Sequence, residues 1–204
     1  MNNIIEFNYL QRMKGDGNMA DITKEKMLEI ESITKNLLID NDFNKSPYVD
    51  IVSIVKKDGF EVKPQEMPIE TTGCLFVSDD KERTERLIMV NTVFKNPDGE
   101  LDVIFKKSRF ITAHEYGHYK LHKPVDQPLY AHRDSDKRDE PEEMEADFFA
   151  RSILMPMEYF KLYYSVLNEF GNSDESFTVE MLSRLFKVTR NKIRKRIGDI
   201  SVLG

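Results

Sequence analysis

The chain has 204 residues, of which 40% are hydrophobic and 32% charged, enough for one compact domain with a well-solvated surface. Its formal net charge of −6 argues against a general binder of nucleic acid or of anionic membranes. The single cysteine, Cys74, excludes an intramolecular disulfide framework and fits a reducing compartment. The first residues lack the pattern of a signal peptide, and no apolar run reaches the roughly 18 residues of a membrane span, so we expect a cytoplasmic protein without a membrane partner.

Composition along the chain suggests three parts. Residues 1–20 contain a polar, glycine-containing stretch and are expected to form a flexible N-terminal extension. Residues 21–170 hold most of the periodic apolar pattern and are expected to form the main domain. Residues 171–204 are expected to form a C-terminal, helical segment that resembles a helix-turn-helix.

The first half of the chain predicts two helices followed by three strands. Apolar residues at helical spacing predict a helix over residues 23–39, and Ser46 and Pro47 predict the start of another that Gly59 ends. Three β-rich runs predict short strands, at residues 60–63, 73–78 and 86–91. The last two are joined by polar residues that predict a long hairpin connection.

The second half predicts helices separated by one polar loop. A long helix ends near His122, and a loop over residues 124–140 follows it. Further helices are predicted at 140–154 and 157–169, and a last pair at 178–186 and 189–197. We expect Thr178 and Thr189 to cap the last pair and Gly198 to end it.

Residues 114–118 of the long helix read HEYGH and match the pattern H-E-x-x-H. Residues four apart share one face of a helix, so His114 and His118 can ligate one Zn²⁺. Glu115 then reaches the water that the metal activates, takes its proton and passes it to the leaving amine. The plainer alternative is a helix whose His and Glu side chains merely face solvent. Gly117 inside this helix costs about 1 kcal/mol relative to Ala, which predicts that another backbone approaches it closely.

A catalytic zinc needs a third protein ligand and one open position. His122 lies on the same helix face, but it is about 12 Å from His114 along the axis, at 1.5 Å per residue. One ion cannot take all three imidazoles. We therefore expect His122 to support a ligand from behind, or simply to be a histidine that the helix C-terminus favours.

The acidic helix at 140–154 is the remaining source of the third ligand. Its acidic residues are Glu142, Glu143, Glu145 and Asp147, and most acidic clusters of this kind simply face solvent. Its apolar stripe is expected to be buried and consists of Ala146, Phe149, Ala150, Ile153 and Leu154. Glu143 extends that stripe and is the preferred ligand, with Glu145 as the alternative. Asp147, four residues after Glu143, is expected to accept the other ring N–H of a ligand histidine.

These motifs together resemble the ImmA/IrrE family of metallopeptidases. The resemblance is carried by residues 109–118, by His122 after Leu121, and by residues 143–156. It implies an α+β fold, in which a small β-sheet accompanies a helical zincin (thermolysin-like) catalytic core and a C-terminal helical pair. Two positions depart from the family: Asp147 stands where Asn is common, and Ile153 where Leu is common.

The resemblance also implies a function. Members of the family typically cleave a helix-turn-helix transcriptional repressor, often encoded beside them on prophages or mobile elements, and so relieve repression. We therefore expect a zinc-dependent endopeptidase that acts as an anti-repressor. The alternative is a non-proteolytic regulator that binds the repressor or DNA, or a toxin–antitoxin component, with a structural metal.

Two further groups of residues leave alternatives open. The tail gathers basic residues, namely Arg184, Lys187, Arg190, Lys192, Arg194, Lys195 and Arg196. They suggest DNA binding or docking onto the repressor, but the negative net charge favours a packed helical pair or a protein-docking role. In the polar loop, Tyr130, His132 and Arg133 are candidate donors to the oxyanion of the transition state, or else surface residues.

Overall fold

The computed structural model describes residues 22–80, 83–93, 101–122, 129–132, 140–171 and 174–204. The predicted flexible extension at 1–20 lies outside these residues. The described helices are α2 (Lys24–Asp40), α3 (Ile51–Lys57), α4 (Leu101–Leu121), α5 (Pro141–Leu154), α6 (Met157–Phe170), α7 (Glu175–Phe186) and α8 (Arg190–Leu203). The strands are β1 (Glu61–Gln65), β2 (Thr71–Asp80), β3 (Arg83–Asn91) and β4 (Leu129–His132).

The four strands form one small sheet in the order β1-β3-β2-β4. Strands β2 and β3 form an antiparallel hairpin, β4 pairs antiparallel with β2, and β1 pairs parallel with β3. Pro64 is tolerated in β1 because an edge strand need not donate every backbone N–H to a neighbour. With its small sheet and its helices, the chain has the α+β class that the sequence analysis expected.

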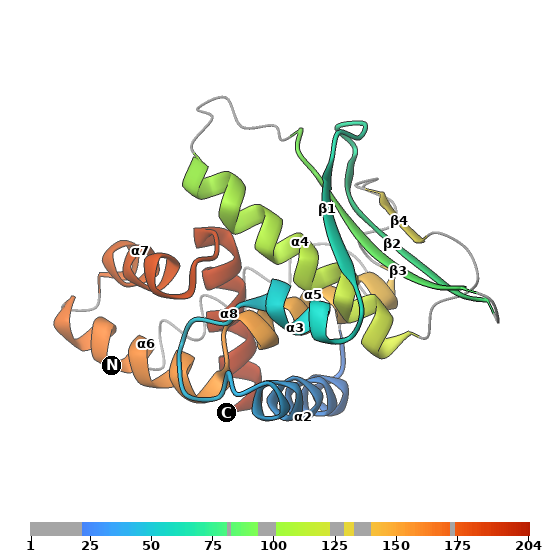
Figure 1. Ribbon diagram of the computed structural model, residues 1–204. Helices are drawn as coiled ribbons and strands as arrows, with labels where there is room; N and C mark the ends of the chain where they lie inside the picture. The colour runs from blue at the N-terminus through green and yellow to red at the C-terminus, as the bar shows by residue number, and fades with distance from the viewer. Residues whose placement is uncertain (1–21, 81–82, 94–100, 123–128, 133–139, 172–173) are drawn as a thin grey trace.

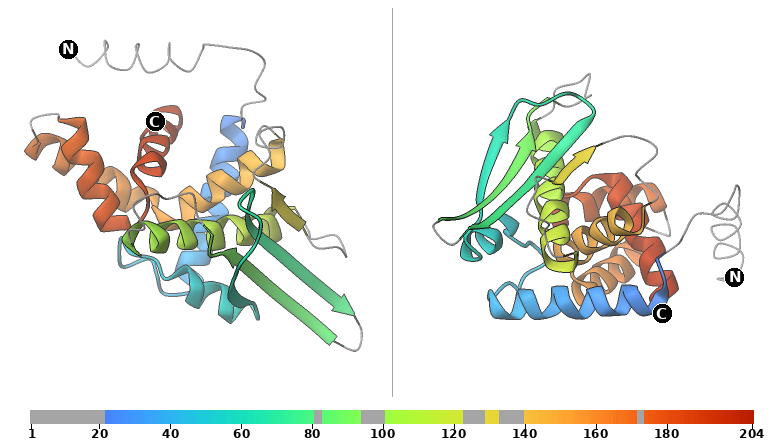
Figure 2. Two further views of the ribbon diagram at one scale, coloured as in Figure 1. Left: turned by 90° about the horizontal axis from the view of Figure 1, so that it is seen from above. Right: turned by 90° about the vertical axis from the view of Figure 1, so that its right-hand side faces the viewer.

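Helix α4 is the centre of the fold. It packs against β2 and β3 on one side and against α5 on the other, as Figure 1 shows. On its far side α5 contacts α2 and α8, so these two helices and the sheet lie on opposite sides of the α4–α5 pair (Figure 2). Helix α3 instead contacts α4 and β1. Burying both helices keeps any polar group between them away from bulk water.

A single apolar core joins these layers. It includes Ile30 of α2, Ile54 of α3, Ile88 of β3, Phe149 of α5 and Phe186 of α7, none of which is exposed to solvent. The predicted buried stripe of α5 is confirmed, since its five members are all fully buried. Among the described residues, no helix is long and apolar enough to cross a membrane.

Two predictions in the first half were wrong in their boundaries. The second helix begins at Ile51 rather than at Ser46, because the Asp50 carboxylate accepts a hydrogen bond from the Ser53 N–H and caps it there. The hairpin is tight rather than long: Asp80 of β2 pairs with Arg83 of β3. Pairing across the hairpin therefore extends into polar residues that the apolar pattern left out.

Three predictions in the second half also need correction. The short strand β4 lies inside the segment predicted to be a loop. Helix α7 begins at Glu175, because the Asp174 carboxylate caps it and leaves Thr178 inside the helix. Thr189 occupies the N-cap position of α8 as predicted, but its side chain makes no capping hydrogen bond. The helix continues past the buried Gly198 to Leu203, since a glycine within a helix does not end it when packing holds both sides. The division into domains stays a prediction.

Candidate metal centre

Three polar residues of α4 are held inside the fold where the helix passes between the sheet and α5. Glu115 is fully buried, His118 is 7% exposed, and the His114 side chain is 12% exposed. The Nε2 atoms of His114 and His118 lie 3.2 Å apart, one helical turn from each other. Both rings thus point their Nε2 atoms to the same point in space.

Helix α5 brings a carboxylate to that point. Glu143 places Oε2 3.2 Å from Nε2 of His114 and Oε1 3.1 Å from Nε2 of His118. The ligand atoms of the three residues all lie within 4.8 Å of one another, so the group can hold a metal ion. Two donors of one tetrahedral zinc, each about 2.0–2.1 Å from the ion, are about 3.3 Å apart, which is close to the separations found here.

Gly117 sets the distance between the two helices. A Cβ atom at this position would lie 3.0 Å from Cδ1 of Phe149 and 3.3 Å from the backbone Cα of Ala146. The close backbone approach predicted from this glycine is therefore confirmed. It allows α5 to reach far enough toward α4 for Glu143 to meet the two imidazoles.

Glu115 faces the sheet and is chemically unusual. Both of its carboxylate oxygens are buried without a hydrogen-bond partner among the described residues. Burial raises the pKa of this carboxyl to about 8; the charge on His114 opposes the rise and the charge on Glu143 adds to it. A Cβ at Gly73 of β2 would come 2.7 Å from Oε1, so only glycine leaves room there. A buried, unsatisfied carboxylate beside a ligand cluster is suited to hold a water and take its proton.

The electrostatics of the cluster favour a cation. Burial acts to lower the pKa of His114, but contacts with the carboxylates of Asp147 and Glu143 outweigh it and raise the pKa to about 10. Burial acts to raise the pKa of Glu143, but its two imidazole partners hold that pKa well below the usual range. The two carboxylates thus stabilise positive charge at the place where the Nε2 atoms converge.

The outer side of His114 faces a second carboxylate of α5. Oδ1 of Asp147 lies 3.3 Å from Nδ1 of His114, although no hydrogen bond of good geometry to this nitrogen is present among the described residues. On its other side Asp147 accepts hydrogen bonds of 3.1 and 2.9 Å from Nζ of Lys192 in α8. Lys192 appeared in the sequence only as one of the basic residues of the tail.

The outer side of His118 faces His122, as the shared helix face suggested. The two Nδ1 atoms lie 3.1 Å apart, and Nε2 of His122 lies 3.1 Å from Oε2 of Glu145 in α5. Glu145 in turn lies 3.6 Å from Nζ of Lys26 in α2. Glu145, the alternative third ligand, therefore contacts His122, and it is Glu143 that the fold brings to the ligand cluster. Glu142 is exposed on α5 and has no part in the cluster.

Other candidate residues are not brought to the centre. Tyr130 and His132 belong to β4, but their side chains and the whole of Arg133 lie outside the described residues, so their predicted role stays untested. Arg109, part of the motif that the family resemblance used, is buried and donates to the backbone oxygens of Val49, Phe186 and Lys187. It thus ties α4 to the turn before α8.

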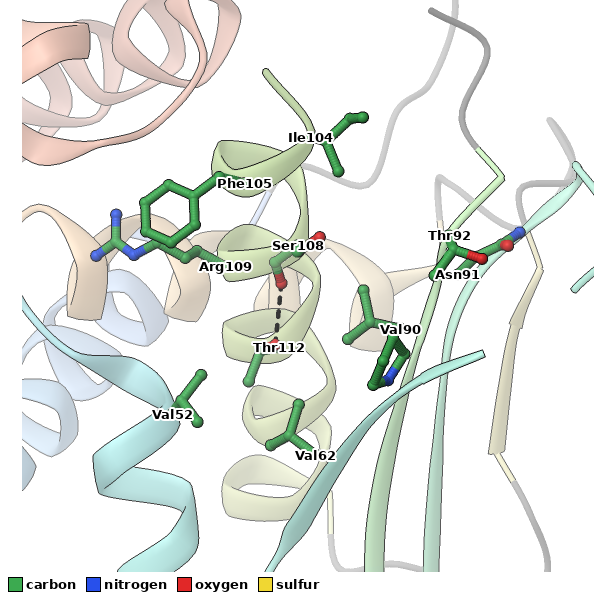
Figure 3. Close-up of a pocket in the computed structure, with 11 residues that line it drawn as sticks. Val52, Val62, Val90, Asn91, Thr92, Ile104, Phe105, Ser108, Arg109 and Thr112 are labelled. Carbon is green, nitrogen blue, oxygen red and sulfur yellow. Dashed lines mark hydrogen bonds between the residues drawn. The ribbon is translucent and has the colours of Figure 1, made fainter. Parts of the chain in front are cut away.

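A pocket of about 240 Å³ lies on another side of α4 and is separate from the metal centre. Figure 3 shows it between α4, α3 and the sheet, lined by Val52, Val62, Val90, Phe105 and Thr112 among others. Thr112 precedes His114 by two residues, and two residues along an α-helix correspond to a rotation of about 200° around its axis. The pocket therefore opens on the helix face opposite to the two imidazoles.

Two histidines and a glutamate from adjacent helices, with a buried glutamate beside them, define a metallopeptidase-like centre. Residues 106–198 match the family model of the Peptidase_M78 family, described as the IrrE N-terminal-like domain. The match supports the ImmA/IrrE family membership that the sequence motifs indicated, and it covers α5 and the part of α4 that carries the cluster. No curated protein matches the chain.

Proposed function

We propose that this protein is a zinc-dependent endopeptidase with a thermolysin-like zincin core. His114, His118 and Glu143 are the proposed zinc ligands, and Glu115 is the proposed catalytic residue. The observation that carries the proposal is the convergence of two Nε2 atoms and one carboxylate beside a buried carboxylate that has no partner. Three protein ligands leave one position open, as catalytic zinc sites require and closed structural sites do not.

In this proposal zinc, when bound, lowers the pKa of a water and polarises the scissile carbonyl. Glu115 accepts the proton of the attacking water on a carboxylate oxygen and later donates it to the leaving amine nitrogen. Burial assists both steps, because it raises the proton affinity of this carboxylate and keeps competing water away. The Asp147 carboxylate, 3.3 Å from the outer ring nitrogen of His114, is the proposed orienting group for this ring.

We further propose that the substrate is a helix-turn-helix transcriptional repressor, cleaved in the cytoplasm so that repression is relieved. This part of the proposal rests on the family resemblance, including the expectation that the repressor is encoded nearby on a prophage or mobile element. The family match over residues 106–198 supports the peptidase class on which it depends.

The alternative, a non-proteolytic regulator that binds DNA through its basic tail, has less support. Several of the basic side chains are engaged within the protein: Arg196 is fully buried and pairs with Glu31, and Lys192 pairs with Asp147. On the surface, Arg184 and Arg190 both pair with Glu180. These contacts favour a packed helical pair over a free cationic surface.

The test is incubation of the purified full chain with the product of the neighbouring repressor gene. Wild type should cut the repressor, and Glu115→Gln should not cut it while still binding zinc. A double variant of exposed tail residues, Arg184→Glu with Lys187→Glu, should cut normally. Loss of regulation in this tail variant, with normal regulation by Glu115→Gln, would instead establish the non-proteolytic alternative.

A further inference from the structure

His122 and Glu145 form a connected path from α5 to the back of His118. Oε2 of Glu145 is 3.1 Å from Nε2 of His122, and Nδ1 of His122 is 3.1 Å from Nδ1 of His118. The path is shielded from solvent, with side-chain exposures of 20% for Glu145 and 10% for His122. It ends on the ring whose other nitrogen, Nε2, belongs to the ligand cluster.

The donors and acceptors along this path can be arranged in only one order if His118 is to bind a metal. An ionised Glu145 can only accept, so Nε2 of His122 must donate to it. A neutral His122 then has a lone pair on Nδ1, which accepts from the Nδ1–H of His118. His118 is left with its lone pair on Nε2, the atom that faces Glu143 and His114.

We propose that Glu145 and His122 are positioning residues, which together hold His118 in the tautomer and orientation that a metal ion requires. The carboxylate acts through an intervening imidazole rather than directly on the ligand histidine. The inference rests on the metal site of the proposed function. It gives a role to Glu145, which the apolar pattern of its helix left as the alternative ligand.

Two simpler explanations fit the contacts less well. If His122 were only a histidine favoured by the helix C-terminus, nothing would require its two ring nitrogens to meet His118 and Glu145 separately. If Glu145 were only a surface ion-pair partner of Lys26, the closer contact would be expected there. Instead the Lys26 contact is 3.6 Å and the His122 contact is 3.1 Å.

The experiment measures zinc affinity of the full chain by competition with a chromophoric chelator. Glu145→Leu should weaken zinc binding about 10- to 100-fold, the effect typical of residues that orient a ligand histidine. Leucine leaves the Nε2–H of His122 without an acceptor, so His122 is no longer held in the tautomer whose Nδ1 accepts from His118. Glu142→Leu, at an exposed position on the same helix, is the matched control and should bind zinc as wild type does.

A second pair of variants separates positioning from packing. His122→Leu should weaken zinc binding to a similar extent, whereas His122→Asn should restore most of the affinity, because its side-chain oxygen can accept from the Nδ1–H of His118. Adding Glu145→Leu to His122→Asn should cause little further loss. Thermal unfolding of the metal-free variants checks that they fold, and the visible spectrum of the cobalt-loaded proteins reports ligand geometry.

The outcomes distinguish this inference from the proposed function. If wild type binds zinc and cuts the repressor, but Glu145→Leu and His122→Leu bind zinc normally, the positioning role is wrong and the peptidase stands. If the variants lose zinc as expected while wild type fails to cut any repressor, the positioning role stands and the proposed activity does not. Equal losses in His122→Leu and His122→Asn would also overturn the inference, because they would indicate a packing effect.

Discussion

The two proposed ligand histidines are supported in different ways on their outer sides. His114 faces a carboxylate directly, that of Asp147, which Lys192 of α8 holds from behind. His118 faces a carboxylate only through His122, and that carboxylate, Glu145, lies near Lys26 of α2. One side therefore depends on the C-terminal helix and the other on the first described helix. What they share is α5, which supplies both carboxylates and the third candidate ligand.

The largest effect on zinc affinity is expected at Glu143, which contacts both histidines. Glu143→Ala removes the carboxylate that contacts both Nε2 atoms, so zinc affinity should fall by at least about 100-fold. Isothermal titration of the full chain with zinc measures it. Glu142→Ala on the same helix is the control and should bind normally. If Glu143→Ala binds zinc as tightly as wild type, the ligand set proposed here is wrong.

A change in helix spacing should affect both sides together. Gly117→Ala puts a methyl group 3.0 Å from the Phe149 ring and 3.3 Å from the Ala146 backbone, so α5 must move away from α4. Overpacking of this kind costs about 1–3 kcal/mol of stability. Chemical denaturation of the metal-free protein should detect that loss, and zinc titration should show weaker binding. Unchanged zinc affinity would mean that the spacing of α4 and α5 does not control the cluster.

The next effect concerns the His114 side alone. Asp147→Leu removes the only carboxylate that faces Nδ1 of His114 among the described residues, and zinc affinity should fall about 10- to 100-fold. Asp147→Asn should lose much less, because an amide oxygen can still accept from the ring N–H. Chelator competition measures both variants side by side. An Asn variant as weak as the Leu variant would show that negative charge, rather than orientation, is what Asp147 supplies.

The smallest effects are expected from the two outer lysines, and they should be unequal. Lys192 donates two hydrogen bonds to Asp147 and is 20% exposed, whereas Lys26 is 30% exposed and lies 3.6 Å from Glu145. Lys192→Met should therefore weaken zinc binding several-fold, and Lys26→Met should change it by less than about twofold, as for a weak surface pair. A larger loss of zinc affinity in Lys26→Met than in Lys192→Met would show that His118 depends more on Lys26 than the contacts suggest.

Helix periodicity was enough to predict the cluster of His114, His118 and Glu143 and the places of Asp147 and His122 beside it, but not the contacts that link these residues to other helices. His114 and His118 follow from spacing on one helix, and the buried stripe of α5 selected Glu143 over Glu145. The contact between His122 and Glu145 could not be predicted, because it depends on how α4 and α5 cross, and that angle is set by packing at Gly117. The contact of Lys192 with Asp147 was missed for the same reason, because the residues around Lys192 do not indicate that α8 packs beside α5.

The errors in the fold have local causes. Strand β4 is only four residues long and forms by pairing with β2, a long-range contact that a polar segment does not reveal. At the start of α7, Asp174 and Thr178 are both good capping residues, and the one that packing favours was not evident. Pattern alone thus located most elements, while tertiary pairing decided where they begin and end.

The most direct test of the account is repressor cleavage by wild type and by Glu115→Gln at equal zinc occupancy. Wild type should cleave the repressor, and the variant, with zinc bound, should be slower by about 10²–10⁴-fold, the range of a proton-transfer group. Only the carboxylate changes to an amide, so the zinc ligands and the fold are kept. Equal cleavage by the two proteins, or none by zinc-loaded wild type, would contradict it.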